Sequence, residues 1–216
     1  MRSVFKRKTL SAQEEAVLHE KVAQTDSHEA QTKGIVGWFY RFYIDATVEF
    51  VKQSGGLVLD VGSGEGMIFK ESGLRPVQLD ISLSRLARAR RYNDALVCAD
   101  AYAMPLSNES FDTVLLIALL EHTSDPRRIL TEAHRVLRPG GRLVVVVPND
   151  VNMSIGRLML CKWPPRYPDH LTFFTPARLR QWTRNLFCVE TGYPMPFKQV
   201  SFWLNMYYFA ILKKLA

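Results

Sequence analysis

The sequence predicts an α/β fold, a doubly wound and mostly parallel sheet that follows an N-terminal helical extension. Apolar runs with the character of strands alternate with helical segments between residues 57 and 147. A turn of alternating glycines, residues 62–66, follows the first run directly, and Asp80 ends the second. This arrangement places a nucleotide-shaped cleft at the carboxyl ends of the strands.

The bulk composition is that of a globular protein. With 216 residues, of which 47% are hydrophobic and 23% charged, the chain is long enough for one domain with a sizeable core. We divide it into an N-terminal helical extension or lid, residues 1–54, and a ligand-binding domain, residues 55–216.

Cysteine usage and targeting signals indicate a cytoplasmic protein. The three cysteines, Cys98, Cys161 and Cys188, are too widely separated for a disulfide framework or a zinc site, so we expect a reducing compartment and no metal. Residues 1–10 are basic but lack the apolar stretch of a secretory signal. No apolar run approaches the ~20 residues of a membrane span.

The net charge of +7 is compatible with an anionic acceptor, a nucleic acid or a membrane surface as partner. A solvated helix face explains such clusters equally well. Much of the charge lies in two clusters, Arg2, Lys6, Arg7 and Lys8, and Arg85, Arg88, Arg90 and Arg91.

Two helices are expected before the first strand. Ser11 and Glu14 form a capping box for a helix over about residues 12–24. Apolar residues at helical spacing predict a longer helix that ends near Gln53. Its stripe consists of Ile35, Phe39, Phe42, Ala46 and Phe50. The aromatic residues Trp38, Tyr40 and Tyr43 form either a lid over the ligand or a packing face.

The next segments alternate between strand and helix. Strands are expected at residues 57–61, 76–80 and 95–99. The glycine turn should open a short helix over residues 64–72, and Ser82 should cap another. The second of these helices is expected to direct Leu83, Leu86 and Ala87 inward.

Residues 111–118 are nearly all apolar, as expected for a central parallel strand that is covered on both faces. Asp125 and Pro126 then start a helix. Its buried stripe consists of Ile129, Leu130, Ala133, Val136 and Leu137. A turn at residues 138–141 leads into a β-branched strand over residues 142–147.

The remainder of the chain is expected to start irregularly, over residues 149–174. Thr175 and Pro176 then begin a helix that carries Leu179, Trp182 and Leu186. Two further strands are expected, the last over residues 206–214. As an alternative, residues 202–215 could lie on a membrane, because they are apolar and aromatic and end in lysines.

The spacing of the glycines indicates which nucleotide the cleft takes. Gly62, Gly64 and Gly66 form G-x-G-x-G, whereas the dinucleotide fingerprint requires glycine or alanine at the position of Met67. Without a pyrophosphate to hold, the turn can surround a smaller, positively charged ligand. A side chain at Gly62 or Gly64 would occupy the place of this ligand.

These motifs resemble class I S-adenosylmethionine-dependent methyltransferases, in their small-molecule, type 11-like branch. The resemblance covers roughly residues 55–190. It also rests on the landmarks Asp100 to Pro105, Phe111-Asp112, Leu120-Glu121-His122, Asp125-Pro126, Leu137 to Gly141 and Asp169 to Pro176. It implies a seven-stranded Rossmann-like methyltransferase sheet that ends in an antiparallel hairpin, S-adenosylmethionine as cofactor, and S-adenosylhomocysteine as product.

The resemblance also implies roles for individual residues. Asp60 would lie near the amino group of the cofactor, Asp80 would accept both ribose hydroxyls, and Ile81 would pack on the adenine. Asp100 and the backbone N–H of Ala101 would read the adenine edge. The turn residues Gly62, Ser63, Gly64 and Gly66 would surround the ligand.

Two histidines are candidates for a catalytic base, which a weakly acidic acceptor needs. His122 follows the central strand, where it either acts in catalysis or holds the loop, and His170 lies in the loop that would enclose the acceptor. His134 is assigned to a surface or packing position, and His19 and His28 lie in the N-terminal arm. The expected acceptor is a small molecule, with an anionic compound as one candidate, and a carbon or amine acceptor does not require a dedicated base.

Three alternative functions remain open. A nicotinamide-dependent oxidoreductase is disfavoured by the glycine spacing and by the lack of a suitably placed Tyr-x-x-x-Lys dyad. A nucleic-acid methyltransferase fits the basic charge, but the Asn/Asp-Pro-Pro-aromatic tetrapeptide of base-amine methylation is absent after the fourth strand, where residues 119–122 read LLEH. The third alternative is a cofactor-binding partner protein without catalysis. The protein is expected to be a monomer or a homodimer.

Overall fold

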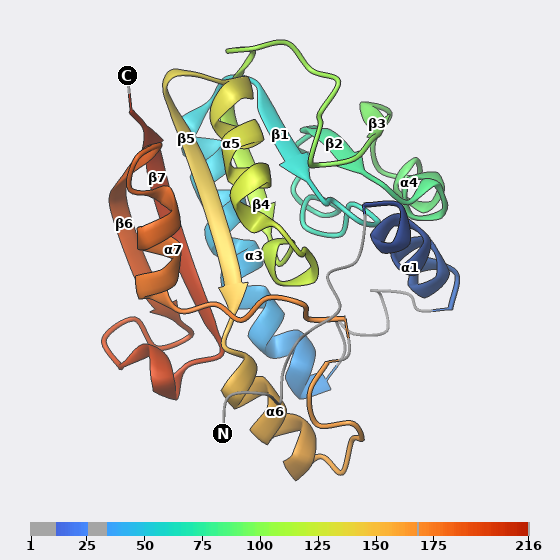
Figure 1. Ribbon diagram of the computed structural model, residues 1–216, viewed down its shortest axis with the longest axis vertical. Coiled ribbons are helices and arrows are strands. Elements are labelled where there is room, and N and C mark those ends of the chain that lie inside the picture. The colour runs from blue at the N-terminus through green and yellow to red at the C-terminus, as the bar shows by residue number, and fades with distance from the viewer. Residues whose placement is uncertain (1–11, 26–33, 168, 216) are drawn as a thin grey trace.

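A computed structural model describes residues 12–25, 34–167 and 169–215 (Figure 1). Expectations for Ser11, for the basic cluster at residues 2–8 and for His28 lie outside the described residues. The strands are β1 (Val58–Val61), β2 (Val77–Asp80), β3 (Leu96–Cys98), β4 (Phe111–Ile117), β5 (Leu137–Pro148), β6 (Phe187–Met195) and β7 (Tyr207–Lys214). The helices are α1 (Ala12–Thr25), α3 (Gly34–Ser54), α4 (Leu83–Ala89), α5 (Pro126–Val136), α6 (Asp150–Met159) and α7 (Pro176–Thr183), with short 3₁₀ turns η1 (Leu120–His122) and η2 (Phe202–Leu204).

The strands form one seven-stranded sheet in the order β3-β2-β1-β4-β5-β7-β6. The first five strands pair in parallel, and β7 runs antiparallel to both β5 and β6. The direction of winding reverses between β1 and β4, which is where a doubly wound sheet opens its ligand crevice. The predicted fold class and the antiparallel edge are confirmed.

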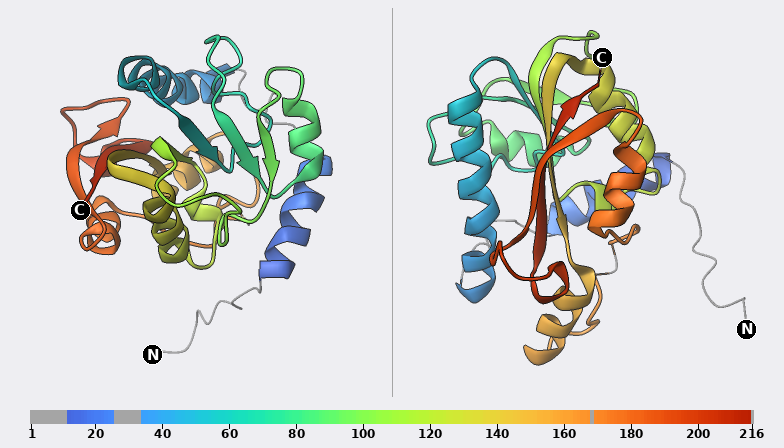
Figure 2. Two further views of the ribbon diagram at one scale, coloured as in Figure 1. Left: turned by 90° about the horizontal axis from the view of Figure 1, so that it is seen from above. Right: turned by 90° about the vertical axis from the view of Figure 1, so that its left-hand side faces the viewer.

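Helices cover both faces of the sheet (Figure 2). Along β4, Val114 and Leu116 face the core that α5 and α7 close, whereas Leu115 and Ile117 face the core that α3 closes. This alternation, with every residue of the strand except Asp112 buried, is what a central parallel strand requires.

Strand β7 lies in the core of the sheet. It is hydrogen-bonded to β5 on one side and to β6 on the other, and Tyr207, Phe209 and Leu212 are buried. The strand interpretation of residues 207–214 is therefore confirmed against the membrane alternative. None of the helices in the described part of the chain has the length and apolar character that crossing a membrane requires.

Three local expectations were wrong. Residues 64–72 form turns instead of a helix, because Gly62, Gly64 and Gly66 all have positive φ angles, of 70°, 58° and 71°. In α4, Leu83 and Ala87 point outward, and Leu86 with Ala89 forms the buried side. The seven-residue helix is too short for its pattern to define a face.

Two further helices differ from expectation. In α3 the fully buried positions are Tyr43, Thr47 and Val51, because aromatic side chains surround the first half of the helix and its sequence does not single out one stripe. Residues 150–159, expected to be irregular, form α6. Asn149 caps this helix by accepting from the backbone N–H groups of Val151 and Asn152.

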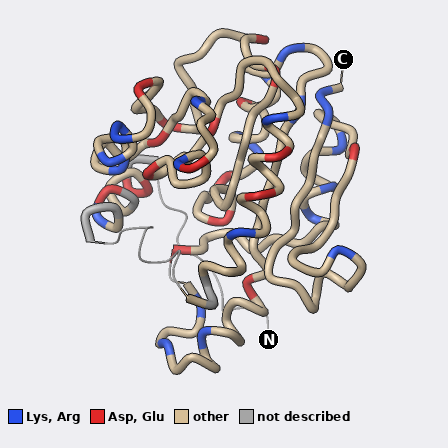
Figure 3. The backbone as a smooth tube through the Cα atoms, turned by 180° about the vertical axis from the view of Figure 1, so that it is seen from behind, with Lys and Arg blue, Asp and Glu red and all other residues tan. Residues whose placement is uncertain are grey.

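The basic residues are distributed over several surfaces (Figure 3). On α4, the cluster that begins at Arg85 includes an ion pair between Arg88 and the buried Glu65, with 2.9 Å between Nε and Oε1. Part of this cluster therefore supports the turn after β1.

Candidate active site

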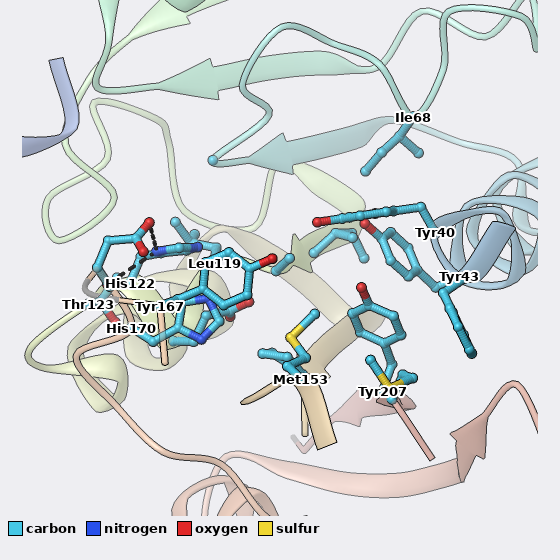
Figure 4. A pocket seen from close by; sticks show the side chains of 18 of the residues that line it. Tyr40, Tyr43, Ile68, Leu119, His122, Thr123, Met153, Tyr167, His170 and Tyr207 are labelled. Carbon is cyan, nitrogen blue, oxygen red and sulfur yellow. Dashed lines mark hydrogen bonds and ion pairs between the residues drawn. The ribbon is translucent and has the colours of Figure 1, made fainter. Parts of the chain in front are cut away.

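A large cavity opens at the carboxyl ends of β1, β2 and β4 (Figure 4). Its wall is completed by α1 and α3 on one side and by α6, the loop around His170 and the segment around η2 on the other. Of the predicted site residues, those that line it are Gly62, Ser63, Asp80, Ile81, Ala101, His122 and His170. Asp60, Gly64, Gly66 and Asp100 lie behind this wall.

The turn after β1 is locked onto β2. The backbone N–H groups of Gly62 and Ser63 both donate to the Leu79 carbonyl, at 2.7 and 3.1 Å. At Gly62, whose φ is positive, a Cβ would lie 2.6 Å from Cδ1 of Leu119. The expectation that a side chain here would displace the ligand therefore needs correction, because it would first meet the loop after β4.

Asp80 is fixed at the tip of β2. Its two carboxylate oxygens accept from the backbone N–H groups of Gly64 and Ser82, each at 2.8 Å. Asp80 is 4% exposed and lines the cavity beside Ile81. The carboxylate is thus held in place by two backbone donors at the edge of the cavity.

Asp60 is buried at the end of β1, and its Oδ2 accepts no hydrogen bond from the described residues. Burial, together with the nearby charge of Asp80, raises the pKa of Asp60 to about 7. An ammonium group would stabilise this carboxylate and provide it with a donor. Asp60 thus offers an unsatisfied oxygen to a positively charged donor, although it does not itself line the cavity.

Asp100 follows β3 and accepts from the backbone N–H of Tyr102 at 2.8 Å. This bond stabilises the turn that presents Ala101 to the cavity. The side chain of Asp100 therefore has a structural role in addition to any contact with adenine.

The two candidate histidines lie next to each other. His122 on η1 and His170 have ring centroids 4.8 Å apart, in a nearly perpendicular arrangement. Each is paired with a carboxylate: Nδ1 of His122 lies 3.2 Å from Oδ2 of Asp169, and Nδ1 of His170 is hydrogen-bonded to Oδ1 of Asp150. The second pair is almost completely buried.

The electrostatics of this cluster couple its members. Burial lowers the pKa of His122, but Asp169 and Glu121 outweigh it and the net shift is upward. Burial tends to raise the pKa of Asp169, but the hydrogen bond from His122 and the charges of His122 and His170 together outweigh it, and the pKa is lowered. Burial raises the pKa of Glu121.

The same cluster contains a possible set of metal ligands. Glu121, His122 and His170 each offer a ligand atom, and these atoms lie within 4.8 Å of one another. Two histidines and one carboxylate form a ligand set that catalytic zinc uses. The sequence analysis expected no metal, and it overlooked Glu121.

Comparisons with known proteins agree with this geometry. A family model described as a methyltransferase domain matches residues 59–145. The ubiquinone/menaquinone biosynthesis C-methyltransferase of Roseobacter denitrificans is 31% identical over 203 residues, which cover 72% of this chain and 81% of that protein. The chain belongs to the class I S-adenosylmethionine-dependent methyltransferases, in the type 11-like branch.

Other matches cover different shares of the chain. The demethylmenaquinone methyltransferase of Renibacterium salmoninarum is 38% identical over 96 residues, which cover 42% of this chain and only 40% of that protein. The structure of the Burkholderia thailandensis 1,6-didemethyltoxoflavin-N1-methyltransferase with bound S-adenosylhomocysteine superimposes with a TM-score of 0.68, at 18% identity, over 98% of this chain and 94% of that one. The predicted family, fold and cofactor are therefore confirmed.

Three tyrosines line the methyltransferase cavity in the region of Ile68 and Met153 (Figure 4). Tyr40 and Tyr43 come from α3, and Tyr207 comes from β7. Burial is the main cause that raises the pKa of each, so all three are neutral hydroxyls at physiological pH. Of the aromatic residues considered for a lid, Tyr40 and Tyr43 line the cavity. Trp38 is instead 48% exposed and packs on neighbouring rings of α3.

Several residues of the methyltransferase site were missed. They are Glu15, Glu121, Asp150, Tyr167, Asp169 as the partner of His122, and Tyr207. Glu121 and Asp169 are part of the quoted landmarks, but nothing in the sequence indicated their pairing. Asp150 gave no signal at all, because α6 itself was not expected.

Proposed function

We propose that this methyltransferase transfers the methyl group of S-adenosylmethionine to a small-molecule acceptor whose hydroxyl group is deprotonated by His170. The observation that carries the proposal is the buried pair of His170 and Asp150, which lies on the cavity wall close to His122. When bound, the cofactor supplies an electrophilic methyl group on a sulfonium.

The cofactor-binding roles follow from the geometry of the strand ends. Asp60 would pair with the ammonium group, and Asp80 would accept from the ribose hydroxyls with the lone pairs that its two backbone bonds leave. Ile81 would contact the adenine face, and Ala101, supported by Asp100, would donate its N–H to the adenine edge. The turn from Gly62 through Ser63 and Gly64 to Gly66 would surround the amino-acid tail.

The base role follows from the tautomer that Asp150 selects. A carboxylate that accepts from Nδ1–H leaves Nε2 as the acceptor nitrogen of a neutral imidazole. Nε2 of His170 would then take the proton of the acceptor hydroxyl. His122, held by Asp169 and in edge contact with His170, would position that ring.

The acceptor class follows from the cavity and from the relatives. Arg157 and Lys162 line the cavity on the side of α6 and would favour an anionic acceptor. The names of the Roseobacter and Renibacterium relatives point to quinone precursors. Loss of a proton from a ring hydroxyl would activate that oxygen, or the ring carbon next to it, as the methyl acceptor.

The test is turnover with a panel of phenols and hydroquinones, measured by mass spectrometry as formation of S-adenosylhomocysteine and methylated product. We expect His170→Gln to lower kcat by about 10²-fold or more, the usual contribution of a general base. Asp150→Asn should lower kcat by a smaller factor. The cofactor Kd of both variants, measured by calorimetry, should be unchanged, because neither residue belongs to the turn after β1.

The outcome of the panel also separates the alternatives. Turnover on RNA or DNA with no turnover on any phenol would indicate a nucleic-acid methyltransferase, and binding without any turnover would indicate a partner protein. Activity that disappears with a chelator and returns with Zn²⁺ would reassign Glu121, His122 and His170 as metal ligands.

We also propose that the protein is cytoplasmic and works as a monomer or homodimer. The three cysteines are exposed and unpaired, which suits a reducing compartment. Light scattering of the purified protein measures the oligomeric state.

A further inference from the structure

An apolar stripe on α6 is exposed to solvent instead of being packed in the core. It consists of Val151, Ile155, Leu158 and Met159, whose exposed fractions lie between 42% and 79%. These positions share one helix face, which a globular protein normally packs against its core. Other positions attach the helix: Met153 packs against the core, and the side chain of Asn152 donates to the carbonyls of Trp203 and Asn205 at 2.9 and 2.8 Å.

The stripe is part of a larger apolar surface. The segment after α6 folds back on the helix, because Nε of Arg157 donates to the Pro164 carbonyl at 3.0 Å. Asn152 joins the helix to the segment around η2. These two segments add Leu160, Trp163, Phe197, Val200, Trp203 and Leu204, all of them exposed. We call this surface, together with the stripe, the α6 face.

The α6 face projects from the end of the molecule at which β5 finishes (Figures 1 and 2). Single exposed apolar side chains are common on protein surfaces, but a contiguous group of this extent marks a surface of interaction.

Every charged residue of the two segments is basic. Residues 151–167 and 196–206 contain no Asp or Glu and carry Arg157, Lys162, Arg166 and Lys198. Figure 3 shows Lys and Arg positions, in blue, along the backbone at this end of the molecule. Apolar side chains flanked by tryptophan, lysine and arginine are typical of helices that lie in the headgroup region of a bilayer, where anionic lipids attract the cations.

We propose that the α6 face docks on the surface of an anionic lipid bilayer. The apolar stripe and Trp163 enter the headgroup region, and Arg166 and Lys198, which do not line the cavity, contact lipid phosphates. Ile155, Met159 and Leu204 also line the cavity, so that its mouth opens onto the docked surface. Docking itself does not depend on the methyl-transfer proposal.

The experiment measures binding of the full chain to phosphatidylcholine vesicles with and without phosphatidylglycerol, by sedimentation and by tryptophan emission. We expect binding to the anionic vesicles only, with a blue shift in emission and with weakening by added salt. The test variant is Leu158→Glu with Trp163→Ser, since neither side chain lines the cavity. Leu83→Ser is the matched control, because Leu83 is 67% exposed but lies on α4.

The double variant should bind the anionic vesicles at least about tenfold more weakly, as expected when one large apolar anchor is removed. The control should bind like the wild type, and all variants should keep the cofactor Kd. The proposal is overturned if the wild-type protein stays in the supernatant with both lipid compositions. It is equally overturned if the double variant binds as well as the wild type, or if a protein partner occupies this face and vesicles do not compete for it.

Discussion

Asp60 combines deep burial with a carboxylate oxygen that no described residue satisfies. Its pKa, raised from 3.8 to about 7, means that a large share of the cofactor-free protein carries a protonated Asp60 near neutral pH. A bound ammonium group favours the ionised form, so that binding should release a proton.

We therefore expect the affinity for S-adenosylmethionine to rise by about 25-fold between about pH 5.5 and about pH 7.5, because the ionised fraction of Asp60 rises by that factor when the pKa is about 7. Asp60→Asn should bind more weakly and show no such rise, whereas Asp94→Asn, at an exposed position, should behave like the wild type. Calorimetry in buffers of different ionisation enthalpy measures both the affinity and the released proton. A wild-type affinity that is flat over this range would remove Asp60 from the ammonium site.

At this scale the sequence predicted that Gly62, Asp80 and Ala101 lie on the cavity wall, whereas their contacts with the cofactor stay a prediction. Positions such as Gly62 and Asp80 are defined by the geometry of strand ends, which a short sequence motif records directly. The acceptor half is different. Asp150 reaches His170 from a segment 20 residues away along the chain, and only the folded structure brings the two together.

Helix α1 is the element that closes the cofactor side of the cavity. Its Glu15 is 3% exposed and accepts from the Tyr102 hydroxyl at 2.9 Å and from the Ser124 backbone N–H at 3.1 Å. The two partners belong to two different loops at the strand ends. The Glu15 carboxylate therefore attaches α1 to both loops. This contact supports the proposed lid role of the N-terminal extension.

Glu15→Ala should loosen α1 and weaken cofactor binding by several-fold, because a buried hydrogen-bonding group that loses its partner costs about 1–3 kcal/mol. Val17→Ala, at a 69% exposed position of the same helix, is the matched control. Limited proteolysis reports the release of α1, and calorimetry reports the affinity. If Glu15→Ala resists proteolysis as well as the control and binds the cofactor as tightly, α1 is not a lid.

Element boundaries were predictable where the periodicity was strong, as for β4 and α5. They were not predictable where glycine conformation or capping decided the outcome. The turns of residues 64–72 follow from positive φ angles, and α6 depends on Asn149, whose side-chain amide also donates to the carbonyls of Phe202 and Asn205. Such contacts join residues far apart in the chain and leave no local pattern.

For the whole molecule, the ion pair of His122 and Asp169 should shape the dependence of stability on pH. Because folding raises the pKa of His122, the protonated imidazole stabilises the fold at low pH. This contribution is lost as the pH rises through the raised pKa. Because folding lowers the pKa of Asp169, the ionised carboxylate stabilises the fold at pH values above 3.8, the pKa in the unfolded chain. This contribution is lost only in strong acid. The pair therefore contributes most between about pH 4 and about pH 6.5.

Asp169→Asn should lower the free energy of unfolding by about 1 kcal/mol within that window, since the pair is partly exposed and screened, and by less above it. Glu190→Gln, which removes a surface ion pair with Arg142 at 2.7 Å, should have little effect at any pH. Denaturant unfolding at a series of pH values measures both. An equal loss at all pH values would mean that the contact of Asp169 with His122 is not ionic.

The close approach of Gly62 to Leu119 has a kinetic consequence. Leu119 directly precedes η1, and Ala118 before it holds a positive φ of 51°, an uncommon conformation for a residue with a Cβ. The turn that receives the cofactor therefore packs against the segment that carries His122. We expect ordered binding, with the cofactor first and the acceptor second. The base would then deprotonate the acceptor only when a methyl donor is already bound.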